Sequence, residues 1–120
     1  MENTNEKIAI LLKKVGISPA LLGYKYISAA SKLVLADSSF IDNITSGLYP
    51  YIAKEYGTTS SRVERAIRHG VETAFVNMPP DIKKAVFGNT VVGGKVTNSA
   101  FIATLVDIIE NEPNNIIWKL

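Results

Sequence analysis

Residues 49–69 read YPYIAKEYGTTSSRVERAIRH, and this stretch decides the fold. Its first part predicts a helix over residues 49–56, with Pro50 in the first turn and Gly57 at the end. Four small hydroxyl residues follow at positions 58–61, and such residues are typical of helix N-terminal caps. A second helix is therefore expected over about 60–76.

These two helices have the residue types that a helix-turn-helix requires. Ala53 is small enough for the second helix to cross closely, Gly57 tolerates a positive φ at the turn, and Val63 faces back toward the first helix. We expect further core residues at Ile52, Tyr56, Ala66 and Ile67. The spacing of Ser61 and Glu64 matches a capping box, which predicts that their side chains cap the second helix.

The second helix has two chemically different faces at 100° per residue. The apolar face, within an arc of about 140°, contains Val63, Ala66, Ile67, Gly70, Val71 and Ala74. The guanidinium of arginine suits guanine O6 and N7, and a carboxylate accepts from cytosine N4. We therefore expect the opposite face to contact DNA bases through Arg62, Glu64, Arg65 and Arg68. The plainer interpretation is a solvated face with Glu64 and Arg68 as an i,i+4 ion pair.

The rest of the chain also has helical periodicity and short breaks. Helices are expected over residues 6–15, 19–36, 40–46, 81–87 and 100–110, with a loop or small hairpin over 90–96. Trp118 is expected to pack back onto the body. We predict an all-α fold in which residues 1–120 form a single compact bundle of about six helices, containing the helix-turn-helix and no receiver domain.

Composition excludes several function classes. The 120 residues include no cysteine and a single histidine, His69, so disulfides, thiolate chemistry and a His/Cys metal site are excluded. No acidic pair accompanies the histidine or a serine as general acid/base catalysis would require, so we expect neither an enzyme nor a cofactor. A signal peptide and an apolar run of about 18 residues are both missing, and we expect a cytoplasmic protein without a membrane partner.

Several motifs together resemble one known family. The stretches Leu48–Tyr56 and Thr58–His69, together with Val15-Gly16, Gly23-Tyr24, Phe87-Gly88 and Thr97–Ala103, resemble the C-terminal effector domain of the sporulation master response regulator family, stage zero sporulation protein A. The resemblance spans nearly the whole chain. It implies a six-helix domain that recognises a duplex-DNA element of the TGTCGAA type and regulates transcription in the control of sporulation initiation.

The resemblance also implies roles for individual residues. Arg62, Glu64, Arg65 and Arg68 correspond to positions on the helix in the major groove, and Lys95 to a loop that reaches toward DNA. The region of Lys84 and Phe87 corresponds to a contact with the primary sigma factor of RNA polymerase, and family members bind adjacent boxes in tandem. From their places on the expected helices, the further candidates for phosphate contact are Ser61, Lys54, His69 and Ser99.

Three departures from the family pattern leave a second hypothesis open. The chain shows no receiver domain, the loop over 91–96 is shorter with Val96 where the family has proline, and Met78-Pro79-Pro80 replaces a more polar link. The alternative function is a receiver-less protein-interaction module that dimerises or binds the sigma factor and antagonises a related regulator. Sequence-indifferent DNA binding with a tight protein partner would distinguish this module from a DNA reader.

Overall fold

The computed structural model describes residues 3–88 and 94–120, and these contain six α-helices and no strand. This confirms the predicted all-α bundle of about six helices. The elements in chain order are α1 (Thr4–Lys14), α2 (Leu22–Ala36), the 3-10 helix η1 (Ser38–Asp42), the π-helical turn η2 (Ile44–Leu48), α3 (Tyr49–Tyr56), α4 (Ser60–Asn77), α5 (Pro80–Phe87), α6 (Asn98–Asn111) and the 3-10 helix η3 (Ile116–Trp118).

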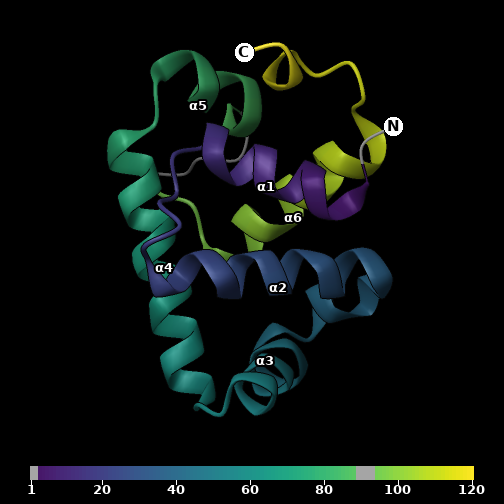
Figure 1. Ribbon diagram of the computed structural model, residues 1–120, viewed down its shortest axis with the longest axis vertical. Coiled ribbons are helices and arrows are strands. Elements are labelled where there is room, and N and C mark those ends of the chain that lie inside the picture. Colours follow the sequence, from purple (N-terminus) through teal and green to yellow (C-terminus); the bar gives the residue numbers. More distant parts are fainter. Residues whose placement is uncertain (1–2, 89–93) are drawn as a thin grey trace.

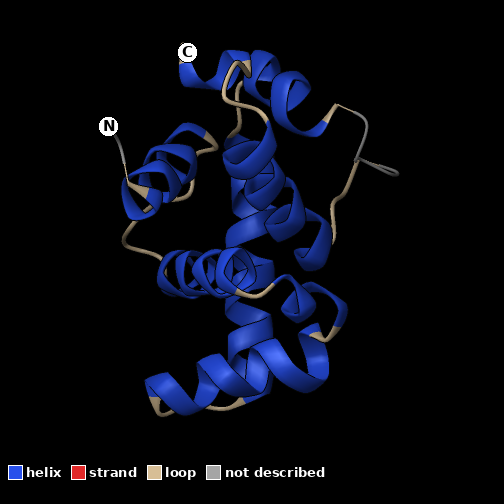
Figure 2. Cartoon of the chain, turned by 90° about the vertical axis from the view of Figure 1, so that its right-hand side faces the viewer, coloured by secondary structure: helices blue, strands red, loops and turns tan. Residues whose placement is uncertain are grey.

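Helices α2 and α4 cross closely near the middle of the molecule (Figure 1). The crossing point is made by two glycines, Gly23 of α2 and Gly70 of α4. A methyl group built on Gly23 would lie 2.4 Å from the backbone oxygen of Ala66, so only glycine allows this approach. The crossing sets the orientation of α4, which extends beyond α2 toward α3 at one end and toward α5 at the other (Figures 1 and 2).

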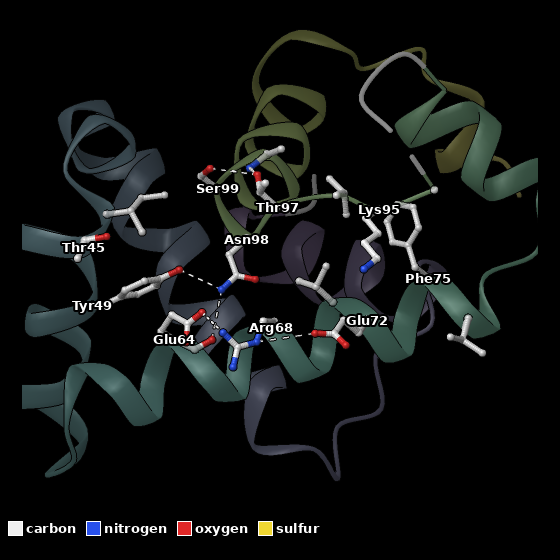
Figure 3. Close-up of a pocket in the computed structure, with 16 residues that line it drawn as sticks. Thr45, Tyr49, Glu64, Arg68, Glu72, Phe75, Lys95, Thr97, Asn98 and Ser99 are labelled. Atoms are coloured by element: carbon white, nitrogen blue, oxygen red, sulfur yellow. Dashed lines mark hydrogen bonds and ion pairs between the residues drawn. The ribbon is translucent and has the colours of Figure 1, made fainter. Parts of the chain in front are cut away.

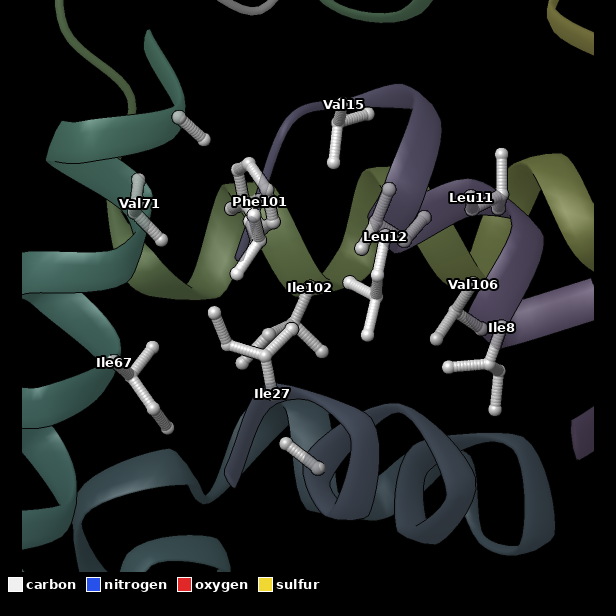
Figure 4. Packing of buried hydrophobic residues seen from close by; sticks show 14 of the residues in the cluster. Ile8, Leu11, Leu12, Val15, Ile27, Ile67, Val71, Phe101, Ile102 and Val106 are labelled. Atoms are coloured by element: carbon white, nitrogen blue, oxygen red, sulfur yellow. The ribbon is translucent and has the colours of Figure 1, made fainter. Parts of the chain in front are cut away.

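One apolar core joins α1, α2, α4 and α6 (Figure 4). Its fully buried side chains include Leu11, Leu12, Ile27, Ile67, Phe101 and Ile102. Side chains of α4 spaced three to four residues apart enter this core, as a helix with one apolar face requires. The inner face of α4 is therefore held by the core, while its outer face remains available to solvent.

Local signals explain the ends of α1. Asn3 and Glu6 form a capping box at its start, with the Glu6 N–H donating to the Asn3 side chain at 2.8 Å. At its end Gly16 has a φ of 87°, and the N–H groups of Gly16 and Ile17 donate to the carbonyls of Lys13 and Leu12. This is a Schellman ending, with Gly16 in its left-handed position.

The C-terminal segment packs back onto the body, as predicted for Trp118. The Trp118 indole N–H donates to the Glu112 carbonyl at 2.9 Å, and the Lys14 amine donates to the Ile117 carbonyl at 2.8 Å. Ile117 itself is fully buried. These contacts tie η3 to α1 and to the end of α6. None of the helices within the described residues is long and apolar enough to cross a membrane.

Two of the predicted helix boundaries are wrong. The second helix begins at Leu22 rather than near residue 19, because the N–H of Leu21 and the N–H of Ala20 both return to Ser18 and close a turn there. Leu22, the first residue of this helix, is exposed. Residues 40–46 do not form one helix, since the backbone breaks at Asn43 between η1 and η2.

Candidate nucleic-acid interface

Helices α3 and α4 form the helix-turn-helix that the sequence predicts. Helix α3 ends at Gly57, whose φ is 65°, and the N–H of Thr58 donates to the Ala53 carbonyl at 2.9 Å. The Thr59 hydroxyl then accepts the Arg62 N–H at 3.2 Å and begins α4. Ala53 is buried, as are Ile52, Val63 and Ile67. The turn therefore has the left-handed glycine and the buried helix contacts expected of the motif.

Two predictions about this motif need correction. Thr59, not Ser61, caps α4, and the Glu64 side chain pairs with Arg68 instead of completing a capping box. Tyr56 is 42% exposed rather than a core residue. It is the last residue of α3, and its ring packs edge-on against the Tyr26 ring. The Lys25 amine lies 4.9 Å from the centroid of the Tyr56 ring.

The two faces of α4 are confirmed by burial. The inward positions Val63, Ile67, Gly70, Val71 and Ala74 are buried, and Ala66 is half-buried against α2. Arg62, Arg65, Arg68, His69 and Ser61 are exposed on the other face. Glu64 lies between the two faces and is half-buried. A row of planar donors therefore faces solvent on a helix whose back is fixed in the core.

Arg68 is held between two carboxylates of its own helix. One guanidinium nitrogen lies 2.6 Å from Glu64 Oε1, and its Nε lies 3.8 Å from Glu72 Oε1. The i,i+4 pair of the plainer interpretation is therefore present, and it orients the Arg68 side chain. Within residues 3–88 and 94–120, Arg62 and Arg65 make no ion pair, so their donors stay open to solvent.

A groove of about 1060 Å³ runs along one side of α4 (Figure 3). Its opposite wall is the segment Gly94–Ala100, which leads into α6, and Ile44 and Thr45 also line it. Val71, Phe75 and Val76 form the apolar part of the α4 wall. The polar side chains that line the groove are Glu64, Arg68, Glu72, Lys95, Asn98 and Ser99. The groove thus has Lys95 and Ser99 in one wall and Arg68 in the other.

Asn98 and Tyr49 are site residues that sequence reasoning missed. The Asn98 amide donates to the Tyr49 hydroxyl at 3.0 Å and to the Glu64 carbonyl at 3.2 Å (Figure 3). One side chain therefore joins the starts of α6 and α3 to the recognition helix. The sequence alone assigns neither residue a role at the site. Neither has a local signal, because the bonds connect residues far apart in the chain.

The surroundings of the Tyr49 hydroxyl favour its neutral form. Burial raises the pKa of Tyr49, and the nearby Glu64 carboxylate adds to this, while the bond from Asn98 and the Arg68 charge act in the opposite direction. A neutral hydroxyl can accept the Asn98 amide and avoids placing a second negative charge next to Glu64.

The remaining predicted residues lie at several places on the molecule. Lys54 is exposed in the last turn of α3, and Lys95 and Ser99 are exposed at the groove. Lys84 is exposed on α5. Phe87 is not, since its ring is fully buried between Phe75 and Phe101, with centroids 5.2 and 5.1 Å away. The expectation that Phe87 itself touches polymerase is therefore corrected, because its ring belongs to the core.

Most of the loop expected over 90–96 lies outside the described residues, since the structure describes only Gly94, Lys95 and Val96 of that stretch. In the part of the chain that is described, no three His, Asp or Glu side chains lie together as metal ligands would. The chemistry that the site itself offers is hydrogen-bond donation from arginine and lysine, with one half-buried carboxylate as an acceptor.

The comparison with known families agrees with this geometry. The family described as Sporulation initiation factor Spo0A C terminal matches residues 8–109. The match covers the helix-turn-helix, the groove wall and most of α1 and α6. On this match the chain belongs to the Spo0A C-terminal family, and it is a sporulation-related DNA-binding effector domain of the response-regulator class.

Proposed function

We propose that this protein is a sequence-specific regulator of transcription that inserts α4 into the major groove of duplex DNA. The observation that carries the proposal is the outer face of α4, where three arginines stand within seven positions and a half-buried carboxylate lies at the edge. The opposite face of this helix is buried in the core. Direct reading of bases needs rigidly presented planar donors, and the N-terminal half of such a helix is where base contacts are made.

Each of the four α4 residues has a distinct role in the proposal. Arg62 and Arg65 donate to guanine O6 and N7, because their guanidinium groups point to solvent without an ion pair among the described residues. Glu64 accepts from cytosine N4 or orients Arg68, and Arg68 donates to a guanine or a nearby phosphate. The target is an element of the TGTCGAA type, the kind that the family resemblance implies.

Phosphate contacts on both sides of α4 would set its register. Lys95 and Ser99 line the groove in the wall opposite α4, and Lys54 lies on the first helix of the motif. Ser61 and His69 belong to the exposed face of α4 itself. Lysine, hydroxyl and imidazole groups at these places are suited to phosphate oxygens, which position a protein without reading sequence.

The proposal includes two protein contacts. Copies of the domain bind adjacent DNA elements in tandem or as a homodimer, and the α5 surface around Lys84 contacts the primary sigma factor of RNA polymerase. Lys84 is exposed in the last turn of α5, at the opposite end of α4 from the turn of the motif (Figure 1). A partner bound there would leave the DNA-reading face of α4 uncovered.

Fluorescence anisotropy tests the DNA-reading function. The purified protein is titrated against a duplex with one TGTCGAA element and against a scrambled duplex, at two salt concentrations. We expect a preference for the element of about 4 kcal/mol or more, which survives the higher salt. Equal, steeply salt-dependent binding to both duplexes would refute base reading and would favour the receiver-less interaction module.

The substitution Arg65→Ala tests the assignment of the helix. Loss of one bidentate arginine should cost about 1–3 kcal/mol and relax the preference at one base pair. Lys119→Ala is the matched control, because it removes one exposed positive charge near the C-terminus, away from α4. Unchanged base preference in Arg65→Ala would contradict the assignment, and so would an equal loss in the control.

A further inference from the structure

The amide of Asn98 connects α6, α3 and α4 at the edge of the groove. Its two N–H bonds both have acceptors, the Tyr49 hydroxyl at the start of α3 and the Glu64 carbonyl in α4. Asn98 itself is the first residue of α6 and is half-buried. A planar amide that donates in two directions fixes both the distance and the orientation of its neighbours.

The chain on either side of Asn98 carries the groove residues. Lys95 lies three residues before it and Ser99 directly after it, and both line the wall opposite α4. Figure 3 shows the Lys95 amine directed across the groove toward α4. On the α4 side, the residue bonded to Asn98 is Glu64, whose carboxylate holds Arg68. The hydrogen bonds of Asn98 therefore link the segment that carries Lys95 to the part of α4 that holds Arg68.

The side-chain hydrogen bonds of the residues next to Asn98 stay within their own segment. Thr97 caps α6 locally, through its bond with the Ala100 N–H and its contact with Ser99, and neither bond reaches α4. Val96 is only partly buried. Among the described residues, the side-chain hydrogen bonds from the segment 94–99 to α3 and α4 are those of Asn98.

We propose that Asn98 is a positioning residue for DNA binding, which holds the segment Gly94–Ser99 against the recognition helix so that Lys95 and Arg68 face one stretch of the DNA backbone. This inference rests on the proposed function. It identifies the groove between α4 and this segment as the place of a DNA phosphate backbone, and it adds Asn98 and Tyr49 to the residues that DNA binding requires.

Three variants separate positioning from simple loss of stability. Asn98→Ala removes both bonds, and Tyr49→Phe removes only the hydroxyl acceptor. Asn115→Ala is the matched control, because Asn115 is also a half-buried asparagine with two amide bonds, to Ala85 and Glu112, but it lies at η3. All three are first compared by thermal unfolding, and DNA binding is measured at a temperature where each remains folded.

In the anisotropy assay, Asn98→Ala should weaken binding to the element about three- to tenfold and lower the salt dependence by about one phosphate contact. Asn98→Ala should keep the base preference that Arg65→Ala loses. Tyr49→Phe should lie between Asn98→Ala and the wild type, and Asn115→Ala should bind like the wild type. In a double-mutant cycle, Lys95→Ala should add little to Asn98→Ala, because the lysine has already lost its place. Full affinity in Asn98→Ala, or additive effects with Lys95→Ala, would overturn the proposal.

A distance measurement tests the positioning without DNA. The chain has no cysteine, so Lys95→Cys and His69→Cys provide two unique sites for spin labels. Electron paramagnetic resonance then measures the distance between the two labels. The distance distribution should be narrow when Asn98 and Asn115 are both intact and should broaden in Asn98→Ala. It should stay narrow in Asn115→Ala. An unchanged distribution in Asn98→Ala would refute the positioning role. If the distribution broadens while the unaltered protein shows no preference for the element, the proposed function fails and the anchoring by Asn98 stands.

Discussion

Replacing Gly23 with alanine perturbs the crossing of α2 and α4, which orients the whole DNA-reading face. The new methyl group would lie 2.4 Å from the Ala66 oxygen and 3.2 Å from the Ala66 carbonyl carbon. Both atoms are backbone of α4, so no side chain can rotate away to make room. Cβ atoms essentially never come closer than 3.0 Å to another heavy atom, so the two helices must separate by at least about 0.6 Å.

The expected cost follows from that separation. Overpacking of this kind costs about 1–3 kcal/mol, while the better helix propensity of alanine returns at most about 1 kcal/mol. We therefore expect Gly23→Ala to lower the free energy of unfolding by about 1–2 kcal/mol, and to lower the melting temperature by about 4–8 °C for a domain of this size. The partial separation of α2 and α4 should also weaken DNA binding, because α4 loses its support.

Gly70 on the facing helix is the internal control. A methyl group there would lie 3.4 Å from the Ile27 Cδ1 atom, the free end of a side chain, and 3.7 Å from the Gly23 Cα atom. A small rotation of Ile27 makes room, and alanine is the better helix former, so Gly70→Ala should change stability by less than about 1 kcal/mol. Both variants are measured by urea and thermal unfolding followed by circular dichroism. The reasoning is wrong if Gly23→Ala melts at the wild-type temperature, or if the two variants lose the same stability. In either case the close approach of Gly23 to Ala66 would not determine how α2 and α4 cross.

Three further predictions follow from single contacts. Glu72→Gln should strengthen DNA binding to any sequence, because Arg68 loses a competing carboxylate. Anisotropy compares this variant with the control Glu110→Gln, which removes another exposed carboxylate, and equal affinities of the two variants would contradict the reasoning. Burial raises the pKa of Tyr49 above its ordinary value of 10.0, so the folded protein holds the tyrosine proton more tightly than the unfolded chain does. The resulting stability is fully present below pH 10.0 and is lost as the pH rises through the pKa of the folded protein. Tyr49→Phe should therefore flatten the fall in melting temperature between pH 9 and pH 11 (about one unit on each side of 10), and parallel curves would contradict the assignment. Phe87→Ala should cost about 3–5 kcal/mol in urea unfolding, because its ring is fully buried, and a loss below about 1 kcal/mol would contradict that placement.

Local chemistry determined the parts of the site that could be predicted from the sequence. The division of α4 into two faces follows from its period of 3.6 residues, and the positive φ of Gly57 follows from the need to end α3 sharply. The helix-turn-helix spacing combines those two signals. Each depends on residues within a few turns of one another, so one stretch of sequence contains all of the information that each signal needs.

Tertiary packing alone decided the rest. The family resemblance implies a polymerase contact for Phe87, yet Phe75 and Phe101 from two other helices close over its ring. The groove exists because α6 begins beside α4, and Asn98 reaches Tyr49 across 49 positions of the chain. Such contacts have no period and no required residue type at a fixed spacing. They arise from the angle at which whole helices cross, which the close approach at Gly23 sets and which a one-dimensional pattern does not contain.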